Sequence, residues 1–373
     1  MKKRLLNVLI FLVTVSLPLY SQTTNLQDSI STSRHNAITT AIEDVSDAVA
    51  GINVSAIQTY SMSNDPFFNM FFPELRRQHK VQSVGSGAVI SPDGYIVTNY
   101  HVVEDAIVGN AGKIVVTLPP GKEYKSELVG HDKVSDIALL KIDVQDAPYI
   151  RMGNSDNIIL GEWVIALGNP FGLFSVSNRP SVTVGVVSAL NMDFGAQRNE
   201  RVYQDMIQTD ASINTGNSGG PLVNAHGELI GINTFIFTGD NYSRGSIGIG
   251  FAIPVNRVKT VVEQLKKYGE IDRSYKTGLT VHNISTPMAE YLGLKTNDGV
   301  IVSNIKDNSS ADKSGFKVGD VIIKVGETRV QSKATISQYI KANFLKAGDT
   351  LPFTVIRDGK KINLKLELEK YDR

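Results

Sequence analysis

Residues 216–223 read Gly-Asn-Ser-Gly-Gly-Pro-Leu-Val, and this stretch does most to decide the fold. Glycines close to Ser218 on both sides allow a tight turn, so the N–H groups of Gly216 and Ser218 can point at one spot. Converging N–H groups are what an oxyanion needs, so Gly216, Asn217 and Ser218 form a candidate oxyanion hole. A glycine-rich turn with a solvated serine is the alternative, which the Gly-Gly-Pro continuation and the apolar residues after it disfavour.

A nucleophilic serine needs a base, and His101 is the best candidate among the six histidines of the chain. It closes the run 96–101, which we predict to be a strand whose end holds the side chain at a cleft. Asp136 directly precedes the apolar run 137–140 and is the candidate carboxylate that orients this base. A core histidine and a turn aspartate are the alternatives for the two residues.

The order of the three residues along the chain separates two classes of hydrolase. His, Asp, then Ser is the chymotrypsin-type order, whereas in α/β-hydrolases the partners follow the serine. After Ser218 come only His226, in a turn almost adjacent to it, and His282, in a second module. The chain has neither a H-E-x-x-H motif nor a phosphate-binding loop. The sequence therefore predicts acyl transfer by serine, with no metal and no other cofactor.

Short apolar runs between turns, from about residue 50 to 255, predict a sandwich or barrel. The clearest runs are 87–90, 95–97, 114–116, 137–140 and 163–166. Residues 91–94 and 225–228 are predicted hairpin turns between such runs. A helix is predicted next, capped by Asn256 and ended by Gly269, because Val258, Val261, Val262 and Leu265 have helical spacing.

A second module begins near residue 276, after a boundary at 269–275. Three strands are predicted at 299–305, 320–325 and 351–357, and a helix at 333–343. Alternation of apolar and polar residues from 362 to 369 predicts a last strand.

Composition and the N-terminus limit the function classes. A formal charge of +1 gives no electrostatic footprint for nucleic acid. The absence of cysteine excludes disulfides, thiolate zinc sites and thiol catalysis. Residues 1–21, basic and then apolar, predict a secretory signal peptide, followed by a polar segment at 22–47. The alternative is an uncleaved anchor, and we expect membrane contact only if this segment is retained.

Taken together, the chain resembles the HtrA/Deg family of trypsin-like serine proteases with one C-terminal PDZ module. The resemblance rests on residues 98–103, 135–141, 168–170, 208–211, 216–221 and 247–254. It implies a mainly β fold: a chymotrypsin-like double six-stranded β-barrel protease domain at 48–268, then an α+β PDZ domain at 276–370. It also implies that His101 is the general base, Asp136 its orienting partner and Ser218 the nucleophile.

The resemblance maps the specificity pocket onto Ile213, Ile236 and Ile249, which implies cleavage after Val, Ile, Leu or Ala. Each isoleucine could equally be core filling. Trypsin-like enzymes that cut after Lys or Arg carry an acid where this chain has Ser212, so such cleavage is disfavoured.

The resemblance implies activation by loop ordering within a homotrimer, or a multiple of trimers, because Asn217 stands where zymogen-activated relatives carry Asp. The aromatic-rich segment 64–73 is expected to meet other subunits. The family often has an arginine after residues 188–190, where this chain has Asn-Met; Arg198 or Arg201 is the candidate replacement.

The second module is expected to bind peptide C-termini by strand addition. Its carboxylate loop is expected at 276–279, with substrate contacts at Thr277, Gly278, Leu279 and Thr280. Thr277 departs from the family, which usually has a large apolar residue there. The groove is expected between residues 279–284 and 333–343.

The resulting hypothesis is an ATP-independent serine endopeptidase of the bacterial periplasm that degrades unfolded or misfolded envelope proteins. It would be anchored to the inner membrane if the N-terminal segment is retained. One alternative is a regulatory, stress-sensing protease that cuts a specific membrane partner. The other is a peptide-binding chaperone with secondary proteolysis.

Overall fold

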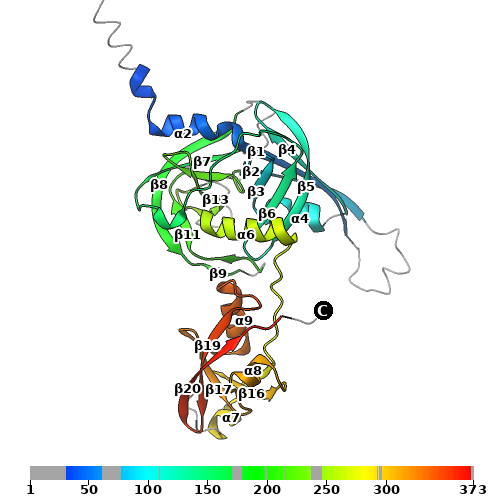
Figure 1. Cartoon of the computed structure of the whole chain (residues 1–373), viewed down its shortest axis with the longest axis vertical. Helices are drawn as coiled ribbons and strands as arrows, with labels where there is room; N and C mark the ends of the chain where they lie inside the picture. Colours follow the sequence, from blue (N-terminus) through cyan, green and yellow to red (C-terminus); the bar gives the residue numbers. More distant parts are fainter. Residues whose placement is uncertain are drawn as a thin grey trace, which may run out of the picture.

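The structure of this 373-residue chain is a computed structural model. It describes residues 31–60, 77–108, 110–169, 179–197, 200–214, 216–236, 246–291, 293 and 296–370. The predicted signal peptide or anchor, the aromatic segment 64–73 and Arg198 lie outside these residues. Figure 1 shows two barrels side by side, with a smaller sheet domain next to them.

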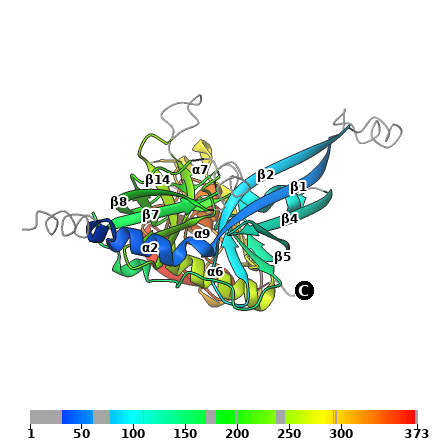
Figure 2. The ribbon, with the colours of Figure 1, turned by 90° about the horizontal axis from the view of Figure 1, so that it is seen from above.

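The first barrel closes in the strand order β1-β2-β3-β6-β5-β4. Its strands are β1 (Val49–Tyr60), β2 (Arg77–Val89), β3 (Tyr95–Thr98), β4 (Asn110–Leu118), β5 (Lys122–Asp132) and β6 (Ile137–Ile142). Strand β6 is buried along almost its whole length, because helix α6 (Val255–Tyr268) contacts it from outside the barrel. Figure 2 shows β1 and β2 extending together beyond the rest of the barrel.

The second barrel closes in the order β11-β14-β13-β12-β7-β8. Its strands are β7 (Trp163–Gly168), β8 (Ser181–Met192), β11 (Met206–Thr209), β12 (Pro221–Asn224), β13 (Leu229–Ile236) and β14 (Gly250–Pro254). A two-stranded hairpin, β9 (Gly195–Ala196) with β10 (Val202–Tyr203), lies outside the barrel. All five predicted apolar runs fall in barrel strands, with Ile90 just past the end of β2, and both predicted turns join hairpins, so the predicted mainly β fold is confirmed.

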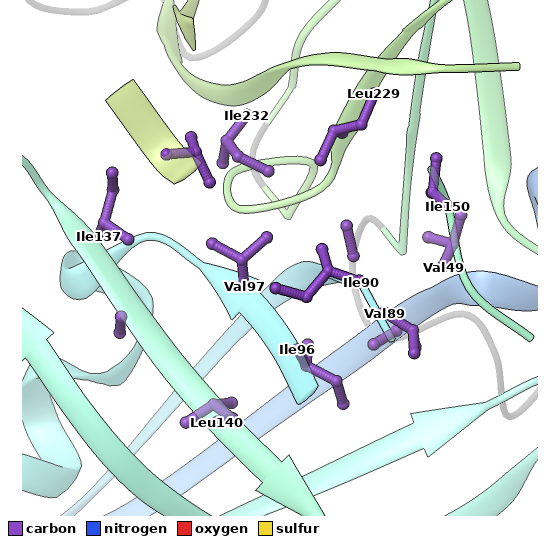
Figure 3. Packing of buried hydrophobic residues seen from close by; sticks show 14 of the residues in the cluster. Val49, Val89, Ile90, Ile96, Val97, Ile137, Leu140, Ile150, Leu229 and Ile232 are labelled. Atoms are coloured by element: carbon purple, nitrogen blue, oxygen red, sulfur yellow. The ribbon is translucent and has the colours of Figure 1, made fainter. Parts of the chain in front are cut away.

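One apolar core joins the two barrels (Figure 3). Val97 and Ile137 of the first barrel belong to the same buried cluster as Leu229 and Ile232 of the second. Because protein interiors are close-packed, this shared core fixes the barrels relative to each other. Side chains from the first barrel can therefore be held at fixed distances from side chains of the second.

Helix α6 buries Val258, Val261, Val262 and Leu265, as predicted from their spacing. It ends at Gly269, whose φ of 75° places the backbone in the left-handed region that glycine adopts readily. The predicted cap at Asn256 was wrong. Pro254, with φ −60° and ψ 140°, is the residue before the helix, so Asn256 falls inside the first turn. Its side chain donates instead to Asn154 Oδ1, at 2.7 Å.

Shorter elements accompany the barrels. Helix α2 (Ala37–Val45) is capped by Asn36, whose side chain accepts hydrogen bonds from the N–H groups of Ile38 and Thr39. Helix α4 (Tyr100–Val108) follows β3, and two 3-10 turns lie at Ser46–Ala48 and Ser155–Asn157. Within the described residues, no helix is long and apolar enough to cross a membrane.

The C-terminal domain is a sheet in the order β15-β16-β17-β19-β20, with β18 paired to β17. Its elements are β15 (Leu279–Asn283), α7 (Thr286–Tyr291), β16 (Val300–Ile305), α8 (Ser310–Lys313), β17 (Val321–Val325), β18 (Thr328–Arg329), α9 (Lys333–Ala342), β19 (Thr350–Arg357) and β20 (Lys360–Glu367). The four predicted strands and the predicted helix of this module are confirmed within a residue or two. The domain has its own buried core, around Val302, Phe353 and Leu366.

Arg273, in the segment that connects the two parts, contacts both of them. Its Nε and Nη2 atoms donate to the two carboxylate oxygens of Asp132, at 3.0 and 2.6 Å. Its Nη1 atom donates to the Phe344 carbonyl of the C-terminal domain, at 3.3 Å. The guanidinium groups of Arg257 and Arg273 lie 4.5 and 5.2 Å from the centroid of the Phe344 ring.

Candidate active site

His101 and Asp136 meet in the first barrel. The His101 Nδ1 atom lies 2.8 Å from Asp136 Oδ2, and the His101 backbone N–H donates to Asp136 Oδ1 at 3.0 Å. Since a carboxylate only accepts, Nδ1 carries a hydrogen, and Nε2 of the neutral ring is left as the acceptor. This arrangement suits a ring that takes a proton at Nε2.

The prediction that His101 ends a strand was wrong, because β3 ends at Thr98 and His101 lies in the first turn of α4. Val102 and Val103 are buried, and Ala106 and Ile107 pack against the same core. That spacing is helical, and it continues beyond the short run on which the strand prediction was based.

Asp136 is fully buried and has a φ of 58°, in the left-handed region that a non-glycine residue seldom adopts. A buried carboxylate is costly unless it is hydrogen-bonded, and Asp136 Oδ2 accepts a further bond from Tyr203 Oη at 3.0 Å. Burial raises the pKa of the Tyr203 phenol, and the negative charge of Asp136 raises it further. Tyr203 therefore stays protonated and remains a donor to this carboxylate.

Ser218 lies in the turn before β12, between two glycines with positive φ, Gly216 at 99° and Gly219 at 84°. Its hydroxyl donates to the Thr234 carbonyl at 3.0 Å. In the described part of the chain this hydroxyl makes no hydrogen bond to His101. A transfer of the Ser218 proton to His101 would therefore require rotation of the Ser218 side chain.

The candidate oxyanion hole has two N–H groups available. Among the described residues, no backbone hydrogen bond engages the N–H of Gly216 or Ser218. The N–H of Asn217 donates to the Asn214 carbonyl at 2.9 Å, so it closes the turn in this conformation. The structure thus leaves Gly216 and Ser218 as donors and gives Asn217 a turn-closing role.

Ser86, on β2, is a site residue that sequence reasoning missed. Its N–H donates to the Ser218 carbonyl at 2.9 Å and its hydroxyl to the Gly216 carbonyl at 2.6 Å. The hydroxyl also accepts from the N–H of Asn169 at 2.7 Å. Ser86 thereby holds the serine turn of the second barrel against the first. The available signal was a serine flanked by Gly85 and Gly87, directly before the apolar residues 88–90.

The predicted specificity pocket falls partly within the described residues. Ile213 is buried, and a Cβ built on Gly250 would lie 2.7 Å from its Cδ1 atom, so the Ile213 side chain occupies the space beside this glycine. Ile236 pairs with Gly250 across β13 and β14, and its side chain lies outside the described set. Ile249 is half-buried against the barrel core. The backbone therefore brings the Ile213 side chain and the Ile236 position to the same glycine.

The predicted peptide-binding residues lie at the open edge of the C-terminal sheet. Strand β15 carries Leu279 and Thr280, and among the described strands it pairs only with β16. The N–H of Leu279 donates to Thr277 Oγ1 at 3.2 Å. Gly278 has a φ of 76° and packs directly on Ser309. Helix α9 is joined to the end of β15 by a hydrogen bond from Lys333 N–H to Asn283 Oδ1, at 2.8 Å.

No group of histidine, aspartate and glutamate side chains in the described ranges could hold a metal ion. The described polar residues of the site are arranged for proton transfer and for binding an oxyanion, which is the chemistry of acyl transfer.

Comparison with known proteins assigns both parts of the chain. Residues 85–232 match the trypsin-like peptidase domain, and residues 277–368 match the PDZ domain. A relative from Pseudomonas putida (strain W619), named as a DegP-like periplasmic serine endoprotease, is 38% identical over 346 residues, which cover 87% of this chain and 68% of that relative. The chain belongs to the HtrA family of trypsin-like serine proteases.

Solved HtrA structures agree with this assignment. The HtrA-type protease AlgW with a decapeptide has a TM-score of 0.60 and 35% identity, covering 89% of this chain and 98% of that one. A serine endoprotease from Yersinia pestis has a TM-score of 0.56 and 30% identity, covering 91% and 99%. A DegP-like relative from Chlamydia trachomatis serovar D is 41% identical over 307 residues, and the match spans 81% of this chain but only 58% of that relative.

Proposed function

We propose that this HtrA chain is a serine endopeptidase in which Ser218 is the nucleophile, His101 the general base and Asp136 the residue that orients it. The observation that carries the proposal is the 2.8 Å contact between His101 Nδ1 and the fully buried Asp136 carboxylate. Ser86 holds the Ser218 turn against the first barrel, which also carries His101 and Asp136.

The reaction follows from these positions. Ser218 Oγ attacks the substrate carbonyl carbon while His101 Nε2 takes the hydroxyl proton. The negative charge then develops on the carbonyl oxygen, which accepts from the N–H groups of Gly216 and Ser218. His101 returns its proton to the departing amine, and water releases the acyl group by the same steps. Asp136 keeps its charge throughout and stabilises the imidazolium.

We further propose cleavage after small aliphatic residues. The buried Ile213 side chain beside Gly250 supports a shallow apolar pocket, and Ser212 supplies no charge for a basic residue.

The periplasm is the proposed location, because relatives over most of this chain are named periplasmic serine endoproteases. The substrates we propose are unfolded or misfolded envelope proteins, whose exposed apolar segments fit an aliphatic pocket. A homotrimer, or a multiple of trimers, is the proposed assembly.

The C-terminal domain is proposed to bind peptide C-termini by strand addition along the open edge of β15. Its contact with the protease domain supports a second candidate, a regulatory protease switched by peptide binding. Arg273 binds Asp132, and Asp132 accepts from the N–H of Ser135, next to Asp136. A peptide that moves the PDZ domain would therefore act on the turn that holds the catalytic carboxylate.

Digestion of β-casein, an unstructured substrate, tests the proposal. We expect the wild-type chain to cut after Val, Ile, Leu or Ala, with fragments identified by mass spectrometry, and the Ser218→Ala variant to cut nothing. Equal cutting by both proteins would contradict the assignment of Ser218. Cutting that begins only on addition of peptides with a free C-terminus would favour the regulatory candidate. Protection of unfolded proteins that survives Ser218→Ala, with no cutting by wild type, would favour a chaperone.

A further inference from the structure

Arg201 brings a positive charge to the candidate catalytic pair. Its Nε atom lies 3.4 Å from Asp136 Oδ1, and its Nη2 atom lies 2.6 Å from Glu104 Oε2. The Arg201 side chain is only 12% exposed, and its guanidinium lies 5.8 Å from the centroid of the Tyr100 ring. Glu104 is in α4, one turn after His101, so Arg201 joins the helix of the base to the carboxylate that orients it.

The fold holds Arg201 in this place through the β9–β10 hairpin. The Arg201 carbonyl accepts from Gln197 N–H at 2.7 Å, and the next residue, Val202, donates to the Val134 carbonyl at 2.8 Å. Tyr203, two residues after Arg201, donates to Asp136 Oδ2. The same short segment therefore contacts the Asp136 turn three times, and Arg201 is positioned by backbone hydrogen bonds as well as by its ion pairs.

We propose that Arg201 and Glu104 are positioning residues that tune the protonation of His101 through Asp136. This inference rests on the proposed function, in which His101 must be neutral to act as a base. A cation beside Asp136 opposes a second positive charge on the imidazole, so Arg201 keeps His101 neutral down to a lower pH. Glu104 partly cancels that cation. The two residues therefore act in opposite directions on the acidic limit of activity.

The other titratable groups near the pair have partners of their own. Lys133 binds Glu200 at 3.0 Å, Asp132 binds Arg273, and Asp105 of α4 accepts from the Ser83 hydroxyl. Tyr100 stacks on His131, with 5.1 Å between the ring centroids. Tyr203 is a protonated donor to Asp136. Within the described residues, Arg201 is therefore the only cation in contact with the Asp136 carboxylate.

The test is the pH dependence of kcat/KM for cleavage of a peptide with an aliphatic residue at the cut. Removing the cation in Arg201→Gln is expected to move the midpoint of the acidic limb to higher pH, by roughly half a unit or more. Glu104→Gln is expected to move it to lower pH. Arg201→Lys keeps a positive charge and is expected to restore much of the wild-type midpoint.

A matched control is Arg329→Gln, which breaks an exposed ion pair with Asp298 (2.7 Å) in the PDZ domain and should leave the midpoint unchanged. A purely structural role for Arg201 would lower thermal stability or kcat without moving the midpoint. Unchanged midpoints in both Arg201→Gln and Glu104→Gln, or shifts in the same direction, would overturn the proposal.

A second readout separates this proposal from the proposed function. The His101 imidazole is titrated by NMR in the Ser218→Ala background, with and without the Arg201 and Glu104 changes, so no cleavage is needed. Opposite displacements of the titration midpoint support the tuning role even if the wild-type chain cuts no substrate, and unmoved midpoints refute it. Absence of cleavage by the wild type would count against the proposed function alone.

Discussion

The N–H and the hydroxyl of Ser86 together make three hydrogen bonds in a place where water has no access, since the residue is fully buried. Replacing it with alanine leaves the Gly216 carbonyl and the Asn169 N–H without this partner. Because buried polar groups without partners are costly, we expect Ser86→Ala to lower the free energy of unfolding by about 1–3 kcal/mol. We also expect kcat/KM to fall roughly tenfold or more, because the Ser218 turn loses its anchor to the first barrel.

Urea unfolding and peptide cleavage, measured on the same samples, check this prediction. Ser91→Ala is the matched control, since Ser91 bonds Asp93 at an exposed turn and should change neither quantity appreciably. If Ser86→Ala cleaves the peptide at the wild-type rate, the Ser218 turn holds its shape without these hydrogen bonds.

Thr277 uses its own hydroxyl to bind an N–H of the proposed carboxylate loop, that of Leu279. Thr277→Ile removes this competing acceptor and is expected to tighten binding of a peptide C-terminus roughly threefold to tenfold. Fluorescence polarisation with a peptide that ends in an aliphatic residue measures the Kd. Thr328→Ile, at an exposed β18 position, controls for added apolar surface. Equal affinities in all three proteins would mean that the Thr277 hydroxyl does not limit binding.

The turn that carries Ser218 is the element on which the site depends most. Gly219 has a φ of 84°, and a Cβ there would collide with the Ser86 carbonyl and the Thr98 hydroxyl. Gly161, in the turn before β7, has nearly the same φ of 86°, but a Cβ there would meet nothing within 4 Å. The two glycines therefore separate backbone strain from close packing.

Alanine at these two positions is expected to have very different effects. Gly161→Ala should lower the free energy of unfolding by about 1–2 kcal/mol, because the alanine must adopt a left-handed backbone conformation but its Cβ meets no other atom. Cleavage should continue. Gly219→Ala should cost clearly more and abolish cleavage, because the turn must move away from Ser86. Chemical denaturation and casein digestion distinguish the two variants. Equal effects would mean that steric collision at Gly219 is relieved at little cost.

At the scale of the whole molecule, the Arg273–Asp132 pair couples the two domains. Burial alone would raise the pKa of Asp132, but hydrogen bonds and the charge from Arg273, with those from Ser135, outweigh it and hold this pKa below its usual value. A carboxylate whose pKa is lowered on folding stabilises the folded state above its unfolded pKa. That contribution is lost as the pH falls through the folded value.

We therefore expect Asp132→Asn to lower the thermal midpoint of unfolding at pH 6 to 7, by an amount equivalent to about 1–3 kcal/mol. The difference from wild type should begin to shrink below about pH 4, where Asp132 of the unfolded chain starts to take up a proton, and should shrink further as the pH falls toward the lower pKa of the folded state. Differential scanning calorimetry over pH 3 to 7 checks both statements. Asp298→Asn, which breaks an exposed pair, is the control. A difference that stays constant over this pH range would contradict an ionised Asp132 as its source.

The sequence by itself determined the fold class and the candidate site residues, because both have local signals. Short apolar runs between turns predict barrel strands, and glycines beside Ser218 predict a turn with converging N–H groups. The order of His101, Asp136 and Ser218 added the type of hydrolase. These features need only neighbouring residues or chain order to be recognised.

Tertiary structure alone decided which residues support the site. Ser86 and Gly216 are 130 residues apart along the chain, and packing of one barrel on the other brings them into contact. Arg201 meets Asp136 because the β9–β10 hairpin folds back onto the turn before β6. Such contacts have no local pattern, since each side chain alone reads as an ordinary polar residue. They arise only when closed barrels and a shared core fix distant segments against each other.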